Sequence, residues 1–292
     1  MSRRFRQEFM PTVALEYLDF INIDLENDTR LGIDPALVNT RDSELGRLRL
    51  NFATIFEDYR QYLWEQIGEG NINEIVRLIN VNESPEVGLG YSKTHRGSGI
   101  GKRLALKIAN QIIDHSTQII PLNQFSMMSV YIRDMGIDRV SDISVGVLKI
   151  DLIEFTQRIC RENHIPMSRV LVNNIFRVSN KTWFSDMVDL PINRFDTSRR
   201  SNKGIILIPK YFLRGKLSIG YPVLSRILRR KTHIEHIRKI YGIKSTEYVS
   251  EEIIRDYALK NPSFVSKFEK EMTKRIKAKT KKGKYKIGNA EN

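Results

Sequence analysis

The chain has 292 residues and a formal net charge of +14, from 48 Lys and Arg residues against 34 Asp and Glu residues. Its hydrophobic share of 41% and charged share of 28% are typical of a folded globular protein and exclude a disordered chain. Cys160 is the only cysteine, which excludes an intrachain disulfide framework and a cysteine-rich zinc site. No secretory signal and no stretch of roughly 18 apolar residues is present, so we expect a cytoplasmic protein without membrane contact.

The first half of the chain is predicted to be mainly helical. Apolar residues recur three and four positions apart, which is the spacing of one face of an α-helix. The segments with this pattern are 42–67, 71–80 and about 102–114. Between them, residues 83–101 carry five glycines within 88–101, and this composition predicts a loop.

The second half is predicted to mix helices and strands. GIDRVSD at 136–142 indicates a turn, with Ser141 or Asp142 capping an amphipathic helix that continues to about residue 163. Segments 169–178 and 204–213 have strand composition, and helix is expected again over 220–259. The fold class that follows is α+β and helix-dominated: a small sheet with amphipathic helices, followed by a basic helical C-terminal segment. We expect a mixed core domain over 1–218 and a basic helical region with a lysine-rich tail over 219–292.

Most of the net charge lies near the C-terminus. Residues 267–286 contain ten Lys or Arg and two Glu, a net charge of +8, and are expected to form a frayed helix or a tail. Further upstream, Arg226, Arg229 and Arg230 have the spacing of a shared helix face. Cations at this density indicate binding to nucleic acid driven by counterion release, although a lysine tail alone also serves solubility. The candidate nucleic-acid-binding residues are Arg226, Arg229, Arg230, Lys231, Lys274, Arg275, Lys277, Lys279, Lys281 and Lys282.

The glycine-rich segment RGSGIGKRL at 96–104 has three interpretations. A P-loop would need one more residue, and Arg103 stands where Ser or Thr would bind magnesium. Arg96 to Gly101 resembles the RxxGxG motif of GNAT acetyltransferases, where backbone N–H groups bind the pyrophosphate of acetyl-CoA, but that fold needs a strand meander upstream. The third interpretation is a structural turn. The candidate phosphate-binding residues are Lys93, Arg96, Gly97, Gly99, Gly101, Lys102 and Arg103.

Asp138 and Asp142 form a candidate catalytic pair. Two carboxylates four residues apart at a helix start are suitable ligands for Mg²⁺ and would position a water for phosphodiester hydrolysis. In the structural alternative, Asp142 caps the helix and Asp138 pairs with Arg139. No E-x-K sequence follows them in a predicted strand, which argues against the commonest nuclease fold. Cys160 falls in mid-helix on the predicted buried side, so a nucleophilic hydrolase is not expected.

Four motifs occur in order between about residues 15 and 215. They are LGIDP (31–35), EVGLGYS with GSGIG (86–101), GIDRVSD (136–142) and IILIPK (205–210). Together they resemble an uncharacterised family of bacterial proteins associated with mobile elements and with phage-defence or restriction neighbourhoods. The resemblance implies a bacterial, cytoplasmic protein, and it implies no particular activity, catalytic residue or cofactor.

Three functional hypotheses follow from the sequence. The first is a nucleic-acid-binding protein of bacterial defence type, acting as a Mg²⁺-dependent nuclease or as the partner subunit of one. The second is a GNAT-type acetyltransferase that uses acetyl-CoA. The third is a non-catalytic adaptor subunit in a multi-component system. The sequence leaves open whether the glycine-rich segment and the Asp138–Asp142 pair lie close together.

Overall fold

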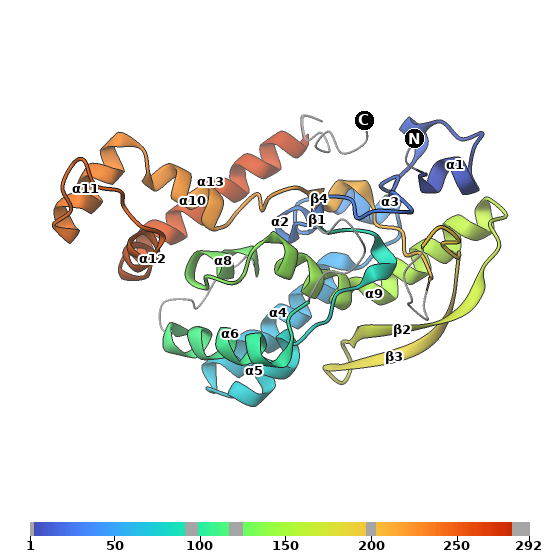
Figure 1. Ribbon diagram of the computed structural model, residues 1–292, viewed down its shortest axis with the longest axis horizontal. Helices are drawn as coiled ribbons and strands as arrows, with labels where there is room; N and C mark the ends of the chain where they lie inside the picture. Colours follow the sequence, from blue (N-terminus) through green and yellow to red (C-terminus); the bar gives the residue numbers. More distant parts are fainter. Residues whose placement is uncertain (1–2, 91–98, 117–124, 197–202, 282–292) are drawn as a thin grey trace.

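The structure, a computed structural model, describes residues 3–90, 99–116, 125–196 and 203–281 (Figure 1). Helices dominate these ranges, and two small antiparallel sheets of two strands each accompany them. The predicted helix-dominated α+β class is therefore confirmed. Within these ranges, no helix combines the length and the apolar composition that crossing a membrane would require.

The helices and strands fall into three groups along the chain. Before the glycine-rich segment lie α1 (Phe5–Phe9), β1 (Gly32–Ile33), α2 (Pro35–Val38), α3 (Asp42–Arg47), α4 (Phe52–Gly68), α5 (Ile72–Ile79) and the 3-10 turn η2 (Pro85–Val87). After it lie α6 (Lys102–Asp114), α8 (Met128–Tyr131), α9 (Ile137–Glu162), β2 (Ser168–Arg177), β3 (Thr182–Leu190) and β4 (Leu213–Arg214). The last described helices are α10 (Tyr221–Leu228), α11 (Lys231–Tyr241), α12 (Glu251–Lys260) and α13 (Pro262–Lys281).

The long helix α9 lies at the centre of the molecule. It packs against β1, against both strands of the β2–β3 hairpin and against α4 (Figure 1). Some of its polar side chains bind backbone N–H groups of the surrounding chain, in the short strand β1 and in an irregular segment. The Ser141 hydroxyl accepts a hydrogen bond from the Ile33 N–H at 2.9 Å, and the Thr156 hydroxyl accepts one from the Leu207 N–H at 2.8 Å. Buried backbone groups need such partners, so α9 organises the surrounding chain.

The prediction of one helix over 42–67 is wrong, because the chain breaks between α3 and α4. Two side chains of α9 stabilise the break. The Asp151 carboxylate accepts a hydrogen bond from the Asn51 N–H at 2.8 Å, and Arg158 donates to the Leu48 carbonyl at 2.6 Å. The apolar periodicity is present on both sides of the break, but contacts from a distant helix supply better partners than a continuous helix would.

The predicted turn at 136–142 is also wrong. Gly136 is the N-cap of α9, and the helix already begins at Ile137. Ser141 and Asp142 therefore lie inside α9 and cap nothing. The Ser141 side chain is used for a tertiary hydrogen bond, which sequence spacing alone does not distinguish from a cap.

One of the two predicted strand segments is confirmed and the other is corrected. β2 covers almost all of 169–178 and pairs antiparallel with β3, which had not been predicted. Segment 204–213 contains two isolated bridges, a 3-10 turn over Lys210–Phe212 and the first residue of β4. Its apolar residues are buried, and its N–H groups find other partners: that of Ile206 donates to the Glu86 carbonyl at 2.8 Å. The apolar composition that predicted a strand over 204–213 therefore reflects the burial of these side chains, and most of the segment belongs to no sheet.

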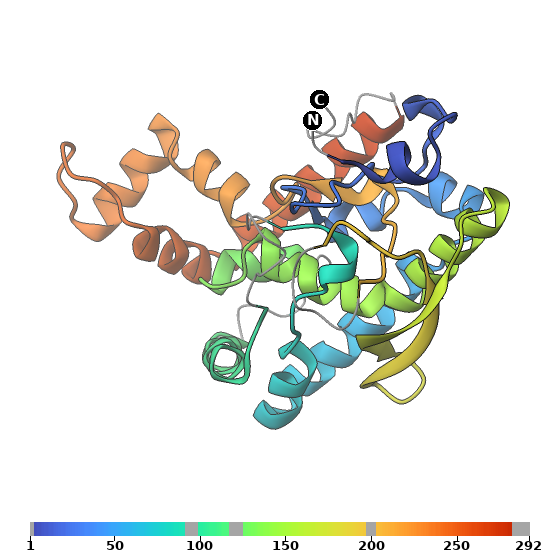
Figure 2. The ribbon, with the colours of Figure 1, turned by 45° about the vertical axis from the view of Figure 1, so that its right-hand side comes forward.

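Helices α10 to α13 form what we call the C-terminal arm (residues 221–281). Its helices α10 to α12 extend to one side of the molecule, and α13 runs back from α12 toward the N-terminal part of the core (Figures 1 and 2). Arg255 joins the arm to the rest of the chain. Its guanidinium donates to the carbonyls of Ser129 at 2.6 Å and Val130 at 2.8 Å, and it lies 4.0 Å from the ring centroid of Tyr221. This buried cation thus connects α12, α10 and α8.

Over the described residues 267–281, the lysine-rich segment forms part of the regular helix α13, whereas a frayed helix or a tail was expected. Four side chains at helical spacing are buried along α13. They are Val265, Phe268, Met272 and Ile276. Because such an apolar stripe stabilises a helix against a neighbouring surface, α13 keeps its position although its outer side is strongly basic. Residues 282–286 of the predicted tail lie outside the described residues.

The hydrogen bond from Leu207 to Thr156 gives a first prediction. Substitution Thr156→Val keeps the side-chain shape but leaves the buried Leu207 N–H without its acceptor. We expect the free energy of unfolding to fall by about 1–3 kcal/mol, measured by urea denaturation. The control is Thr156→Ser, which keeps the hydroxyl and should lose less. Equal losses for the two variants would contradict the role of the hydroxyl.

Candidate functional site

Asp138 and Asp142 lie one helical turn apart at the start of α9 and share a face of the helix. Asp138 is exposed and Asp142 is partly buried. Burial, together with the carboxylates of Glu83 and Asp138, raises the pKa of Asp142 to about 7. We call these three carboxyl groups the acidic cluster. Within it, the Asp142 carboxyl is poised to take up or release a proton near neutral pH.

Lys149 lies two turns further along the same face of α9 and is fully buried. Its ammonium donates to the Ser84 hydroxyl at 2.6 Å and to the Asn173 carbonyl at 2.8 Å, and it lies 3.7 Å from the Glu86 carboxylate. Burial lowers the pKa of Lys149, and the negative charges of Glu86 and Asp142 oppose this shift. With these partners the ammonium fixes segment 84–86 against α9 and β2, so we assign Lys149 a structural role.

The end of the glycine-rich segment meets the acidic cluster at Glu83. The Ile100 N–H donates to the Val81 carbonyl at 2.8 Å. A Cβ added at Gly99 would collide with the backbone of Val81 and Glu83, so only glycine permits this close approach. The structure thus brings two predicted motifs together, because Glu83 contacts the glycine-rich segment and also acts on the pKa of Asp142.

Four of the predicted phosphate-binding residues lie within the described part of the chain. Gly99 and Gly101 precede α6, with Gly101 as its N-cap, and Lys102 and Arg103 are exposed in its first turn. All four line a groove of about 870 Å³ along α6, whose described lining residues include neither Asp138 nor Asp142. The remaining three, Lys93, Arg96 and Gly97, lie outside the described residues.

The predicted Mg²⁺ site remains a prediction. Across the described ranges, no group of three or more His, Cys, Asp or Glu side chains is arranged to hold a metal ion. Asp138, Asp142 and Glu83 supply carboxylate oxygens, which are the ligands that Mg²⁺ prefers, but they are not arranged as a ready coordination shell.

The basic residues of α10 and α11 do not share one helix face, because α10 ends at Leu228. Arg226 lies on α10 and is exposed, whereas Arg230 precedes α11. Arg229 points elsewhere: its guanidinium donates to the Val249 carbonyl at 2.9 Å and lies 4.7 Å from the Tyr248 ring. Arg229 therefore serves the packing of the arm, and the prediction of a shared face is wrong.

The basic residues of α13 are better placed for binding. Lys274, Arg275, Lys277 and Lys279 are exposed. Arg275 pairs with Glu271 at 2.8 Å, one helical turn away, and both side chains of this pair are largely exposed. Lys231 at the start of α11 is exposed as well. Lys281 ends α13 and its side chain is not described, and Lys282 lies outside the described residues.

Sequence reasoning missed Glu83, Glu86 and Lys149. One signal was present: Lys149 interrupts the apolar face of a long amphipathic helix, where a cation requires a buried partner. Nothing local identified that partner, because segment 83–86 is more than 60 positions away in the chain. Cys160 is buried as predicted, and burial raises the pKa of its thiol to about 12, which disfavours a nucleophilic thiolate.

The raised pKa of Asp142 predicts a pH-dependent stability. A carboxyl that binds its proton more tightly in the folded state stabilises the protein below its ordinary pKa of 3.8, and this contribution is lost as the pH rises to about 7. We expect Asp142→Asn to be more stable than the parent chain at pH 8, by about 1–3 kcal/mol after allowance for solvent screening, and to match it near pH 4. Urea denaturation at both pH values measures this. The exposed Asp189→Asn serves as control, and parallel profiles for parent and Asp142→Asn would refute the burial of this charge.

Comparison with known proteins gives one match. A family model with the description "Domain of unknown function (DUF8370)" matches residues 12–220. No curated protein and no solved structure matches the chain. The matched residues include α9, the glycine-rich segment and the acidic cluster, and they end immediately before α10. Because the match covers well over half of the 292 residues, the chain belongs to the DUF8370 family of domains of unknown function.

Proposed function

We propose that the chain binds nucleic acid through the C-terminal arm. The observation that carries this proposal is the docking of α13. Its buried stripe of apolar side chains holds the helix in place, while Lys274, Arg275, Lys277 and Lys279 are exposed around the end of the same helix. A solubilising tail needs no fixed geometry, whereas cations held at fixed spacing on one helix favour a phosphate-binding surface.

The cations of α13 are available for a ligand. Within the described residues, no ion pair holds Lys274, Lys277 or Lys279. The pair between Arg275 and Glu271 is exposed, so breaking it costs little. Since neutralising a phosphate releases condensed counterions, each of these cations adds to affinity at low salt.

Phosphodiester hydrolysis by the core is the second candidate function, and Asp142 favours it. With a pKa near 7, this carboxyl suits general acid–base chemistry at neutral pH. In the metal-dependent form predicted from the sequence, Asp138 and Asp142 would instead supply oxygen ligands to Mg²⁺, with Glu83 beside them, and the bound ion would polarise a phosphate and activate water. A cytoplasmic role in bacterial phage defence, as a nuclease or as its partner subunit, belongs to this proposal and rests on the motif resemblance.

The two alternative functions have less support. An acetyltransferase of the GNAT type needs a strand meander before the glycine-rich segment, but β1 is the one strand described between residues 3 and 90. The adaptor hypothesis predicts that Asp138→Ala and Asp142→Ala would leave the activity of a larger assembly intact.

Neutralisation of α13 tests nucleic-acid binding. The triple variant Lys274→Gln, Lys277→Gln, Lys279→Gln removes exposed cations and leaves the apolar stripe intact. We expect weaker binding to a fluorescent duplex and to single-stranded DNA and RNA, measured by anisotropy over a range of salt concentrations. The slope of log K against log salt should fall by about 2 to 3, because roughly one counterion is released per phosphate contact.

A matched control removes three cations elsewhere. Arg161, Arg169 and Arg194 are exposed on the core and lie outside the arm. Their replacement by Gln lowers the net charge equally but should change the salt slope little. If the two triple variants weaken binding to the same extent, affinity reflects net charge alone and the arm is not the binding surface. Binding that is insensitive to salt in the parent chain would contradict the proposal itself.

A further inference from the structure

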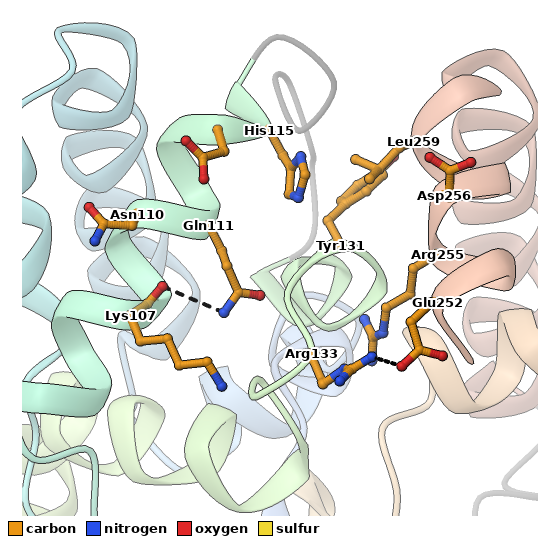
Figure 3. Close-up of a pocket in the computed structure, with 11 residues that line it drawn as sticks. Lys107, Asn110, Gln111, His115, Tyr131, Arg133, Glu252, Arg255, Asp256 and Leu259 are labelled. Atoms are coloured by element: carbon orange, nitrogen blue, oxygen red, sulfur yellow. Dashed lines mark hydrogen bonds and ion pairs between the residues drawn. The ribbon is translucent and has the colours of Figure 1, made fainter. Parts of the chain in front are cut away.

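A second cavity lies between the core and the C-terminal arm. It is a groove of about 520 Å³ with α6 on one side, α12 on the other, and the end of α8 and the residues after it between them (Figure 3). Its size is within the range of small-molecule sites. It shares Lys107 and Asn110 with the groove of about 870 Å³ that Lys102 and Arg103 line, so the two cavities continue along one face of α6.

The two ends of this combined groove differ in charge. Lys102 and Arg103 lie in the first turn of α6, where the helix dipole is also positive, and Lys107 lies in the second turn. No ion pair within the described residues holds Lys102 or Arg103. Lys107 contacts Asp134 at 2.7 Å, but its side chain is mostly exposed, so an anionic ligand can replace that partner at little cost.

The wall opposite α6 also carries Arg133 and Arg255, but these cations are already paired, with Glu252 and Glu251 respectively. At the end away from Lys102 and Arg103, Asp114 of α6 and Asp256 of α12 line the groove. Asp256 already accepts hydrogen bonds from Tyr241 and Lys260, each at 2.7 Å, and its pKa is lowered despite partial burial, so it carries a negative charge. These carboxylates repel phosphate and accept hydrogen bonds from amino and hydroxyl groups.

Amide and ring groups line the space between the two ends. Figure 3 shows Gln111 and His115 reaching from α6 into the groove, with Tyr131 across from them. Among the described residues, the Gln111 amide has one long hydrogen bond, to the Lys107 carbonyl at 3.5 Å, and Asn110 is exposed. Amide side chains offer a donor and an acceptor together, which matches the edge of a nucleobase.

We propose that this groove binds a nucleotide, with its phosphates toward Lys102, Arg103 and Lys107 and its base and sugar between α6 and α12. An inorganic polyphosphate would neutralise the basic end but leave the amide and acidic groups unused. A nucleoside would use the amide and acidic groups but would leave the basic end of the groove without an anion. A nucleotide combines an anionic end with a neutral end that carries hydrogen-bond donors. The groove and the exposed face of α13 are separate sites, so this proposal does not depend on nucleic-acid binding by the arm.

Thermal unfolding and calorimetry with defined probes test the proposal. ATP, GTP, CTP and UTP are compared at equal millimolar concentration with adenosine and with tripolyphosphate, using the full chain. We expect at least one nucleoside triphosphate to raise the unfolding temperature and to bind about tenfold or more tightly than either adenosine or tripolyphosphate. Equal binding of tripolyphosphate would overturn the proposal in favour of a simple anion site, and the absence of binding by all four nucleotides would refute it.

Two substitutions locate the site. Lys107→Met and Gln111→Ala remove the groups assigned to the phosphates and the base, and each should weaken nucleotide binding by about tenfold or more, the loss expected when a charged or buried hydrogen bond to a ligand is removed. Because neither side chain is buried, the unfolding temperature without ligand should stay unchanged. Arg161→Gln is the control and should bind normally. Unchanged affinity in both groove variants would place the nucleotide elsewhere and overturn the assignment.

The α13 triple variant separates this site from the arm surface. It should bind the nucleotide as the parent chain does while losing salt-dependent binding of nucleic acid. If neutralising α13 also abolishes nucleotide binding, the groove is not an independent site and the proposal fails. If nucleic-acid binding is absent from the parent chain but the nucleotide binds with the expected selectivity, only the arm proposal fails.

Discussion

The fold depends on how α9 supplies hydrogen-bond partners to backbone groups that the two small sheets and the irregular segments around them leave unpaired. Ser141 accepts the Ile33 N–H, Thr156 accepts the Leu207 N–H, and the Lys149 ammonium donates to the Asn173 carbonyl. In a larger sheet, neighbouring strands would bind such groups. Here the described sheets have only two strands each, so side chains of one central helix supply the missing partners. This need explains why buried polar residues recur along the central helix α9.

The same requirement shapes the acidic cluster. Lys149 neutralises the buried Glu86 and fixes segment 84–86, which places the neighbouring Glu83 close to Asp142. The contacts of Lys149 thus hold in place the segment whose Glu83 raises the pKa of Asp142, so that the negative charge of Asp142 is unfavourable in the folded state. A carboxyl that lowers the free energy of unfolding near neutral pH is expected where function requires it, because an amide side chain at the same position would give a more stable protein. Asp142 fits this description, whereas Lys149 is held by three polar partners that fix the segment around it, which assigns it a structural role.

The exposed cations of α13, the groove and the acidic cluster lie at three different places in the molecule. Arg255 joins the arm to α8, and the groove lies directly beside that junction. The acidic cluster lies on α9, beside the segment that leads into α6. A ligand in the groove would therefore contact both core and arm, and α6 connects this region to the acidic cluster through Gly99.

The sequence by itself determined the features that depend on neighbouring residues. Apolar periodicity located α5 and α6, composition located β2, and the charge count identified the basic C-terminal region. The tertiary structure decided the rest, because distant residues supplied the deciding contacts. Hydrogen bonds made by Arg158 and Asp151 stabilise the break in the helix expected over 42–67. Segment 204–213 has the apolar composition of a strand because most of its side chains are buried. Asp138 and Asp142 were visible as a spaced pair, but the pKa of Asp142 depends on Glu83, almost 60 residues away. The spacing of apolar residues predicts which face of a helix is buried. It does not predict which charge, carbonyl or N–H group will contact that face, because these groups come from distant parts of the chain.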